Sequence, residues 1–224
     1  MIQRIRLRDR TLPCYSFGEE LTNTLTHGLG ALLAIVALVL CVIKAVKFRS
    51  ATEITAAAIY GGCMTALYCV SSIYHGLRPG MAKKVMQVVD HCTIYLLIAG
   101  SYTVVSLSAL RPLSPALGWG MVIFQWLLAA VAITLTAIDL KAFSVFSMVC
   151  YIGMGWAILP FIRQTHTALG FTGFSLLLAG GISFTIGAVI FGLGSKLRWM
   201  HCIFHVFVVL GSILQFFAIY LYAI

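Results

Sequence analysis

Charged residues are scarce in this chain of 224 residues. They make up 9% of the sequence, whereas ~25% is usual for a soluble domain. Only six residues are acidic, and 61% are hydrophobic. A water-soluble fold of this size could not cover so much apolar surface with polar side chains. The composition therefore excludes a large soluble catalytic domain, and any chemistry must be carried by residues on or between membrane-spanning segments.

Two further signals are missing. The seven cysteines form no C-x-x-C pair and most fall within apolar runs, so we expect buried thiols rather than a disulfide framework. The N-terminus, Met1–Arg10, is basic, but the first apolar run follows only later and is too long for the core of a signal peptide. We expect no cleavage at this end.

Long apolar runs fill the rest of the chain. A membrane helix needs ~20 apolar residues, and these runs lack the period-two alternation of a β-barrel strand. They predict an all-α membrane protein, a seven-transmembrane-helix bundle, with residues 1–19 as an N-terminal segment and residues 20–224 as a single transmembrane domain. The predicted spans are Leu21–Val46, Ile54–His75, Val85–Ala109, Leu117–Ile138, Ala142–Phe161, Ala168–Leu193 and Trp199–Tyr222.

The distribution of basic residues predicts the orientation. Ten of the fifteen Lys and Arg residues lie in the N-terminal segment and in the loops after the second, fourth and sixth spans. Because basic residues are enriched on the cytoplasmic side, we expect a cytoplasmic N-terminus and a C-terminus outside. Ser16-Phe17-Gly18-Glu19 has the form of a capping box, which predicts a first helix that starts before its apolar run.

Polar side chains inside membrane spans are costly, so each needs a reason. They gather in four places: Glu20, Asn23 and His27 at the start of the first span, Ser71 and His75 at the end of the second, Asp90 and His91 early in the third, and His201 and His205 at the start of the seventh. With the N-terminus inside, all four places fall in the cytoplasmic leaflet, because successive spans run in opposite directions. We therefore expect one polar site in that leaflet.

The residue types at this site favour a metal. Neutral imidazole is a preferred zinc ligand, and three protein ligands with one open position is the usual arrangement of catalytic Zn²⁺. His201 and His205 lie one helical turn apart, and His75 would supply a third ligand. Asp90 could accept a proton from a water or orient it, and Ser71 could donate a hydrogen bond to a developing oxyanion.

Two other histidines leave alternatives open. His91 could be a fourth ligand, but its neighbour Asp90 points about 100° away from it on a helix, which favours an interfacial or supporting role. His27 could also be a ligand, although its spacing from Asn23 and Glu20 better suits a hydrogen-bonded polar stripe at the helix entrance.

The order of these motifs resembles a known family. Glu20-Leu-Thr-Asn23-x-x-x-His27-Gly28, Ser71-x-x-x-His75, Asp90-His91-x-x-Ile94-Tyr95-Leu-Leu-Ile-Ala-Gly100-Ser-Tyr-Thr103 and His201-x-x-x-His205 occur in this order. They look like the signature blocks of the bacterial haemolysin-III-like membrane proteins, within the progestin and adiponectin receptor superfamily. The sequence departs from the family at Val104, where proline is common, and at Gln215, where histidine is frequent.

The resemblance implies a seven-helix protein of the bacterial inner membrane, with zinc bound by His75, His201 and His205 and with Asp90 and Ser71 nearby. A broader relationship to alkaline ceramidases implies hydrolysis of a lipid amide or acyl bond. We therefore expect membrane lipids as partners and no nucleic acid. The alternatives are a lipid-homeostasis protein, a non-enzymatic sensor with structural zinc, and a cytolysin. We rank the cytolysin last because no polar stripe crosses both leaflets.

Overall fold

The computed structural model describes residues 6–48, 50–194 and 197–224. Within these ranges the protein is helical and has no β-strand. Three of the basic residues that predict the orientation, Arg4, Arg49 and Lys196, lie outside the described residues. The orientation itself remains a prediction from the sequence.

The described elements are seven α-helices and four short helical turns. The α-helices are α1 (Phe17–Phe48), α2 (Ala51–Gly76), α3 (Met81–Val105), α4 (Pro115–Ile138), α5 (Ser144–Gly155), α6 (Ile162–Gly194) and α7 (Met200–Ala218). The turns are the 3₁₀ segments η1 (Leu7–Asp9) and η3 (Leu159–Phe161), and the π-helical segments η2 (Ser106–Leu110) and η4 (Ile219–Ala223).

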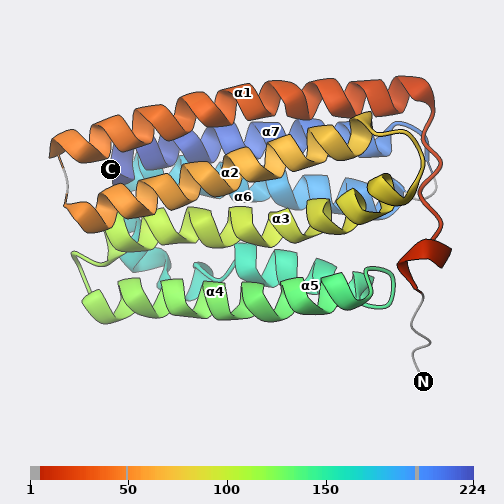
Figure 1. The fold of residues 1–224 in the computed structure, drawn as a ribbon. Coiled ribbons are helices and arrows are strands. Elements are labelled where there is room, and N and C mark those ends of the chain that lie inside the picture. The colour runs from red at the N-terminus through yellow and green to blue at the C-terminus, as the bar shows by residue number, and fades with distance from the viewer. Residues whose placement is uncertain (1–5, 49, 195–196) are drawn as a thin grey trace.

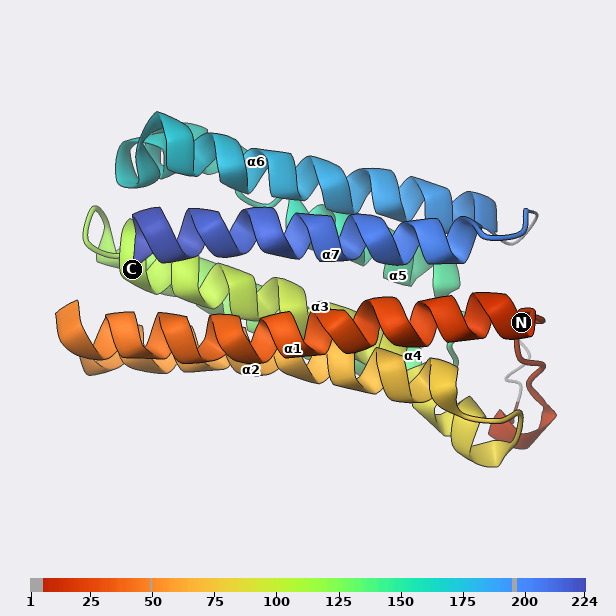
Figure 2. The same cartoon turned by 90° about the horizontal axis from the view of Figure 1, so that it is seen from above.

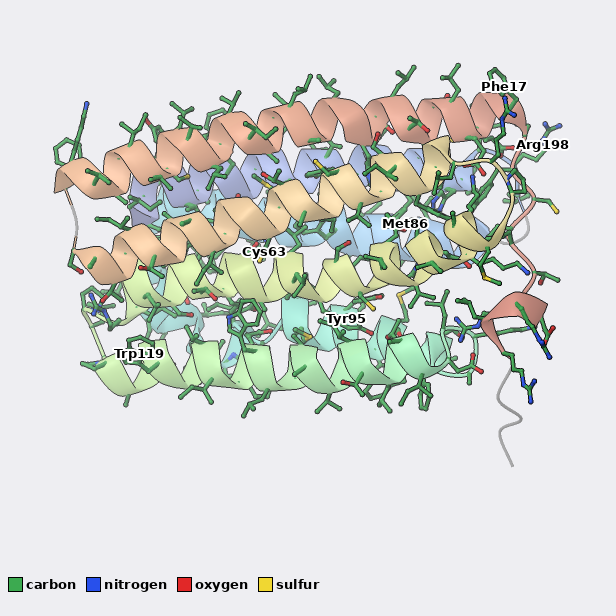
Figure 3. All side chains as sticks on the ribbon, viewed as in Figure 1. Phe17, Cys63, Met86, Tyr95, Trp119 and Arg198 are labelled. Carbon is green, nitrogen blue, oxygen red and sulfur yellow. The ribbon has the colours of Figure 1, made fainter. Side chains whose placement is uncertain are left out.

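The long helices lie side by side, with the start of α1 at one end of the bundle and the C-terminus at the other (Figure 1). α7 packs against both α1 and α6, and the view from above shows it between them (Figure 2). Phe17, at the start of α1, and Arg198, just before α7, mark one end of the bundle, whereas Trp119 of α4 lies at the opposite end (Figure 3). The start of α1 and the start of α7 therefore meet.

Helix starts are fixed by side chains that bind free backbone N–H groups. Ser16 and Glu19 form the predicted capping box, because the Ser16 N–H donates to Glu19 Oε2 at 2.9 Å and the Glu19 N–H donates to Ser16 Oγ at 3.3 Å. α1 accordingly begins at Phe17, ahead of the predicted span. Ser50 and Glu53 form a second capping box at the start of α2.

Large apolar side chains face outward, and small or polar ones face the bundle. The buried face of α1 carries Asn23, His27, Gly30, Ala34, Ala37, Cys41 and Ala45, whereas exposed positions include Leu25, Leu29, Leu32 and Val36. A Cβ on Gly30 would come within 2.6 Å of the Tyr68 ring, and one on Gly61 within 2.6 Å of Leu38. Glycine therefore lets α1 and α2 approach closely, as small residues do between membrane helices.

Six helical stretches within the described residues are long and apolar enough to cross a membrane, and one of them, Ser144–Gly192, joins α5 to α6. The chain is thus a multi-pass helical membrane protein. For the predicted span Ala142–Phe161 the structure differs from the expectation of one continuous helix. α5 has 12 residues, or about 18 Å at 1.5 Å per residue, which is short of a ~30 Å hydrocarbon core.

The break after α5 is built into the fold rather than frayed. The Tyr102 hydroxyl donates to the Gly155 carbonyl at 2.9 Å and accepts from the Ile158 N–H at 3.0 Å. Pro160, which lacks a backbone N–H, stands in η3 directly beyond this break. A second interruption follows at Gly170, whose φ of 68° is the left-handed conformation that glycine adopts most readily.

Candidate metal centre

Three histidine side chains converge at the end of the bundle that holds the N-terminal segment. His75 comes from the last turn of α2, and His201 and His205 come from the first turns of α7. The His201 Nε2 atom lies 3.2 Å from His75 Nε2 and 3.1 Å from His205 Nε2. The ligand atoms of all three residues lie within 4.8 Å of one another, so the group could hold a metal ion.

The spacing of these nitrogens fits a tetrahedral cation. Zinc–nitrogen bonds of ~2.0–2.1 Å at tetrahedral angles place two ligand nitrogens about 3.4 Å apart. Hydrogen bonding alone would serve the group poorly, because a neutral imidazole has a single N–H and His201 Nε2 faces two other nitrogens. A cation at the centre would engage all three lone pairs.

The Glu20 carboxylate orients His75. Its Oε2 atom accepts a hydrogen bond from His75 Nδ1 at 2.7 Å. With the proton held at Nδ1, the lone pair of His75 Nε2 faces the other two histidines, which is the tautomer that a metal ligand requires. Glu20 thus acts on the site through His75 rather than by direct contact with a metal.

Lys83 of α3 holds that carboxylate in place. Its ammonium group donates to Glu20 Oε1 at 2.7 Å, to the His75 carbonyl at 3.2 Å and to the Leu77 carbonyl at 2.9 Å. The side chain is only 4% exposed, so the ion pair is largely shielded from water. The sequence analysis counted Lys83 only among the basic residues that predict the membrane topology. No spacing in the sequence sets it apart from the other basic residues of its loop.

The remaining residues of the α1 stripe also pack on the histidines. The Asn23 side-chain nitrogen lies 3.5 Å from His75 Nδ1, and Asn23 is fully buried. The His27 ring stacks on the His205 ring with centroids 3.6 Å apart and planes at 14°. The ligand atoms of His27 are not part of the converging group, so the structure places this residue against a candidate ligand.

Asp90, Ser71 and His91 lie beside the three histidines. Ser71 is buried one turn before His75 and lines the same cavity as Asp90. His91 donates from Nδ1 to the Gln87 carbonyl at 2.8 Å, and the same nitrogen lies 3.8 Å from Asp90 Oδ2. His91 is therefore turned toward its own helix and stays outside the converging group.

The N-terminal segment covers the site from the end of the bundle. The Tyr15 ring stacks on His201 with centroids 5.0 Å apart and planes at 18°. Burial raises the pKa of the Tyr15 phenol, so this ring remains neutral at physiological pH. Glu19 Oε1 accepts a 2.7 Å hydrogen bond from the backbone N–H of Trp199, whose φ is 66°. Sequence reasoning missed Tyr15 because it precedes the first helix and shares no periodicity with the other site residues.

A cavity of about 150 Å³ begins at the histidines. His27, Ser71, Asp90, His201 and His205 form its polar end. It extends between α3, α5, α6 and α7 to Tyr102, Trp156 and Gln215, and its walls are mostly aliphatic and aromatic: Leu67, Ile94, Leu97, Ile98, Phe184, Phe191 and Val208 are among them. One polar end and a long apolar body are therefore parts of the same space.

Fold and site together define a multi-pass helical membrane protein with a buried three-histidine group that could hold a metal ion. The sequence model of the family "Haemolysin-III related" matches residues 15–216, and the chain belongs to that family. This confirms the family resemblance. In a bacterium, such an integral membrane protein lies in the inner membrane.

Named relatives cover nearly the whole chain. Hemolysin-3 of Bacillus cereus is 40% identical over 206 residues, 92% of each protein. A Hemolysin-3 homolog of Bacillus subtilis (strain 168) is 36% identical over 210 residues, 94% of this chain and 97% of the relative. Monocyte to macrophage differentiation factor of Homo sapiens is 27% identical over 217 residues, 93% of this chain and 85% of the relative.

Proposed function

We propose that this protein is a zinc-dependent hydrolase that cleaves an amide or acyl bond of a membrane lipid. The observation that carries the proposal is the junction of the histidine group with the apolar cavity: His201 and His205 line the same space as Asp90 and Ser71. A polar reaction centre at the end of an apolar pocket suits a substrate with a polar scissile bond and hydrocarbon chains.

The topology that goes with this function has seven crossings. The fifth crossing consists of α5, η3 and the part of α6 before Gly170, and the break after Gly155 lies near its middle. The rest of α6 forms the sixth crossing. A broken helix is tolerated at membrane depth where protein groups satisfy its backbone, as Tyr102 does here. With the N-terminus in the cytoplasm, the histidines lie in the cytoplasmic leaflet.

Bound zinc would supply Lewis acidity for hydrolysis at neutral pH. The remaining work belongs to the side chains beside it. Asp90 would take the proton of the attacking water at its carboxylate oxygen and later return it to the leaving group. Ser71, which lines the same cavity as Asp90, would donate its hydroxyl proton to the oxygen of the scissile carbonyl.

The test is turnover of ceramide and a simple acyl amide in mixed micelles, with zinc content measured on the same samples. We expect Asp90→Asn to keep its zinc and lose turnover by about 10²-fold or more, the usual contribution of a general base. Asp9→Asn is the matched control, because Asp9 is an exposed carboxylate of the N-terminal segment. A zinc-loaded wild type without turnover, or an unimpaired Asp90→Asn variant, would contradict the hydrolase.

A second candidate is a non-enzymatic sensor in which zinc is structural. It is favoured by the way the histidine group joins α2 to α7 while Glu20 and Lys83 join α1 to α3. This function predicts that His205→Ala lowers the thermal stability of the protein while Asp90→Asn leaves its biological activity intact. The Asp90→Asn variant, which keeps its zinc, therefore separates the two candidates.

A third candidate, cytolysis, rests on the name of the Bacillus cereus relative, Hemolysin-3. Among the described residues, the three histidines that could hold a metal gather at one end of the bundle, which favours a local site over a pore across the membrane. Dye release from liposomes at low protein density would favour a cytolysin over the hydrolase.

A further inference from the structure

The N-terminal segment lies across the ends of α3 and α4, at the same end of the bundle as the histidines (Figure 1). Lys84 of α3 donates from its ammonium group to the Arg8 carbonyl at 2.5 Å. Arg10 Nη2 donates to the Ile138 carbonyl at 3.2 Å and lies 3.8 Å from Asp139 Oδ1. Residues 6–10 are thus tied to two helices by side-chain contacts.

These contacts enclose a pocket that is separate from the metal centre. Its volume is about 730 Å³, and it is lined by Arg6, Leu7 and Arg10 from the segment, by Val85, Val88 and Val89 from α3, and by Ala137 and Ile138 at the end of α4. Among the described residues, the charged ones that line it are Arg6 and Arg10. The pocket therefore combines a cationic side with an apolar side.

Arg10 is buried with part of its guanidinium group unused. Its side chain is only 9% exposed, and neither Nε nor Nη1 has a hydrogen-bonding partner among the described residues. Buried polar groups are normally paired, and an unpaired cationic N–H is especially costly. Guanidinium groups match phosphate oxygens with paired N–H donors, and Arg6 adds a second guanidinium at the same pocket.

The apolar wall continues onto the outer surface of the bundle. Val85, Val89 and Ile138 are each about two-fifths exposed, and they lie in the first turns of α3 and the last turn of α4. Helix ends of this kind lie at the level where lipid headgroups meet hydrocarbon, and basic pockets between membrane helices at this level bind anionic headgroups. A lipid acyl chain that lay along Val85 and Val89 would leave the pocket toward the bilayer.

We propose that this pocket binds an anionic phospholipid, whose phosphate contacts Arg10 and Arg6 and whose acyl chain lies along Val85 and Val89. The lipid fixes the N-terminal segment, and with it the cover over the histidines, to the membrane surface. This site is independent of the proposed hydrolase activity.

The experiment measures lipid retained by the full-length protein. Purified protein in detergent is equilibrated with equal amounts of phosphatidylglycerol and phosphatidylcholine, and bound lipids are counted by native mass spectrometry. We expect wild type to retain phosphatidylglycerol preferentially, and Arg10→Gln to lower that retention about fivefold, the effect of one basic contact at a membrane surface. Arg8→Gln is the matched control, because Arg8 is 66% exposed and does not line the pocket.

Two further arms identify the ligand. Val89→Trp fills the apolar side while Arg10 stays in place, so it should lower phosphatidylglycerol retention even if Arg10→Gln fails to fold. Inorganic phosphate at millimolar concentration should not displace the lipid. Equal retention of the two lipids, an equal loss in Arg8→Gln and Arg10→Gln, unchanged retention in Val89→Trp, or displacement by inorganic phosphate would each overturn the proposal.

Discussion

Replacement of Glu20 by glutamine tests whether the candidate metal centre depends on the carboxylate behind His75. In the wild-type protein, His75 Nδ1 lies 2.7 Å from the Glu20 carboxylate. Glutamine keeps the shape of the side chain and one oxygen that can accept this hydrogen bond, but it removes the negative charge. Without that charge, His75 becomes a weaker electron donor and its tautomer is less firmly fixed. We expect weaker zinc binding with little change in the fold.

The size of the effect follows from the surroundings of Glu20. Loss of an outer carboxylate typically lowers metal affinity about 10–100-fold. Glu20 is 20% exposed, and its charge is already shared with Lys83 at 2.7 Å, while glutamine still accepts one hydrogen bond. These three facts place the expectation at the lower end, about tenfold, or ~1.4 kcal/mol in binding free energy.

The assay is competition for zinc between the purified protein and a chromogenic chelator at fixed pH. Glu53→Gln is the matched control, because Glu53 is also a glutamate paired with a basic side chain, but its partners Ser50 and Arg111 lie away from the histidines. His201→Ala sets the level for a lost ligand. If Glu20→Gln binds zinc within about twofold of wild type while His201→Ala does not bind, the orienting role of Glu20 is refuted.

Two predictions concern the bundle itself. Gly61→Ala should lower the free energy of unfolding by about 1–3 kcal/mol, because the new Cβ would meet Leu38 at 2.6 Å. Gly62→Ala is the control and should be neutral or stabilising, because nothing lies within 4 Å of a Cβ there. Equal melting temperatures for the two variants would contradict this account. Tyr102→Phe should cost about 1–3 kcal/mol, since it leaves the Ile158 N–H without its acceptor at the helix break, and hydrogen exchange should rise there rather than across the protein.

Much of the candidate site follows from the sequence because helices have a fixed geometry. A spacing of four residues places His201 and His205 on one face, and alternate span directions bring His75 to the same end of the bundle. Both inferences survive errors of several residues in the helix ends. The same reasoning could not place His27, because contact with His205 depends on how α1 rotates and packs against α7.

The break after α5 marks the limit of hydropathy as a signal. Residues 142–161 are mostly apolar and contain no charged residue, so the sequence predicts a continuous span, yet the helix ends at Gly155. The break is stabilised by the hydroxyl of Tyr102 in α3, which donates a hydrogen bond to the Gly155 carbonyl and accepts one from the Ile158 N–H. A contact between distant segments leaves no local pattern.

The sequence alone indicated the membrane class, the family and the three histidines proposed as metal ligands, because composition, periodicity and motif order are properties of the chain. The tertiary structure alone decided which groups support them. The Lys83 and Glu20 side chains lie behind His75, Tyr15 covers His201, and Arg10 is buried with unused donors, each because elements remote in sequence pack together. Burial and partners are set by packing, so they emerge only when the helices are in place.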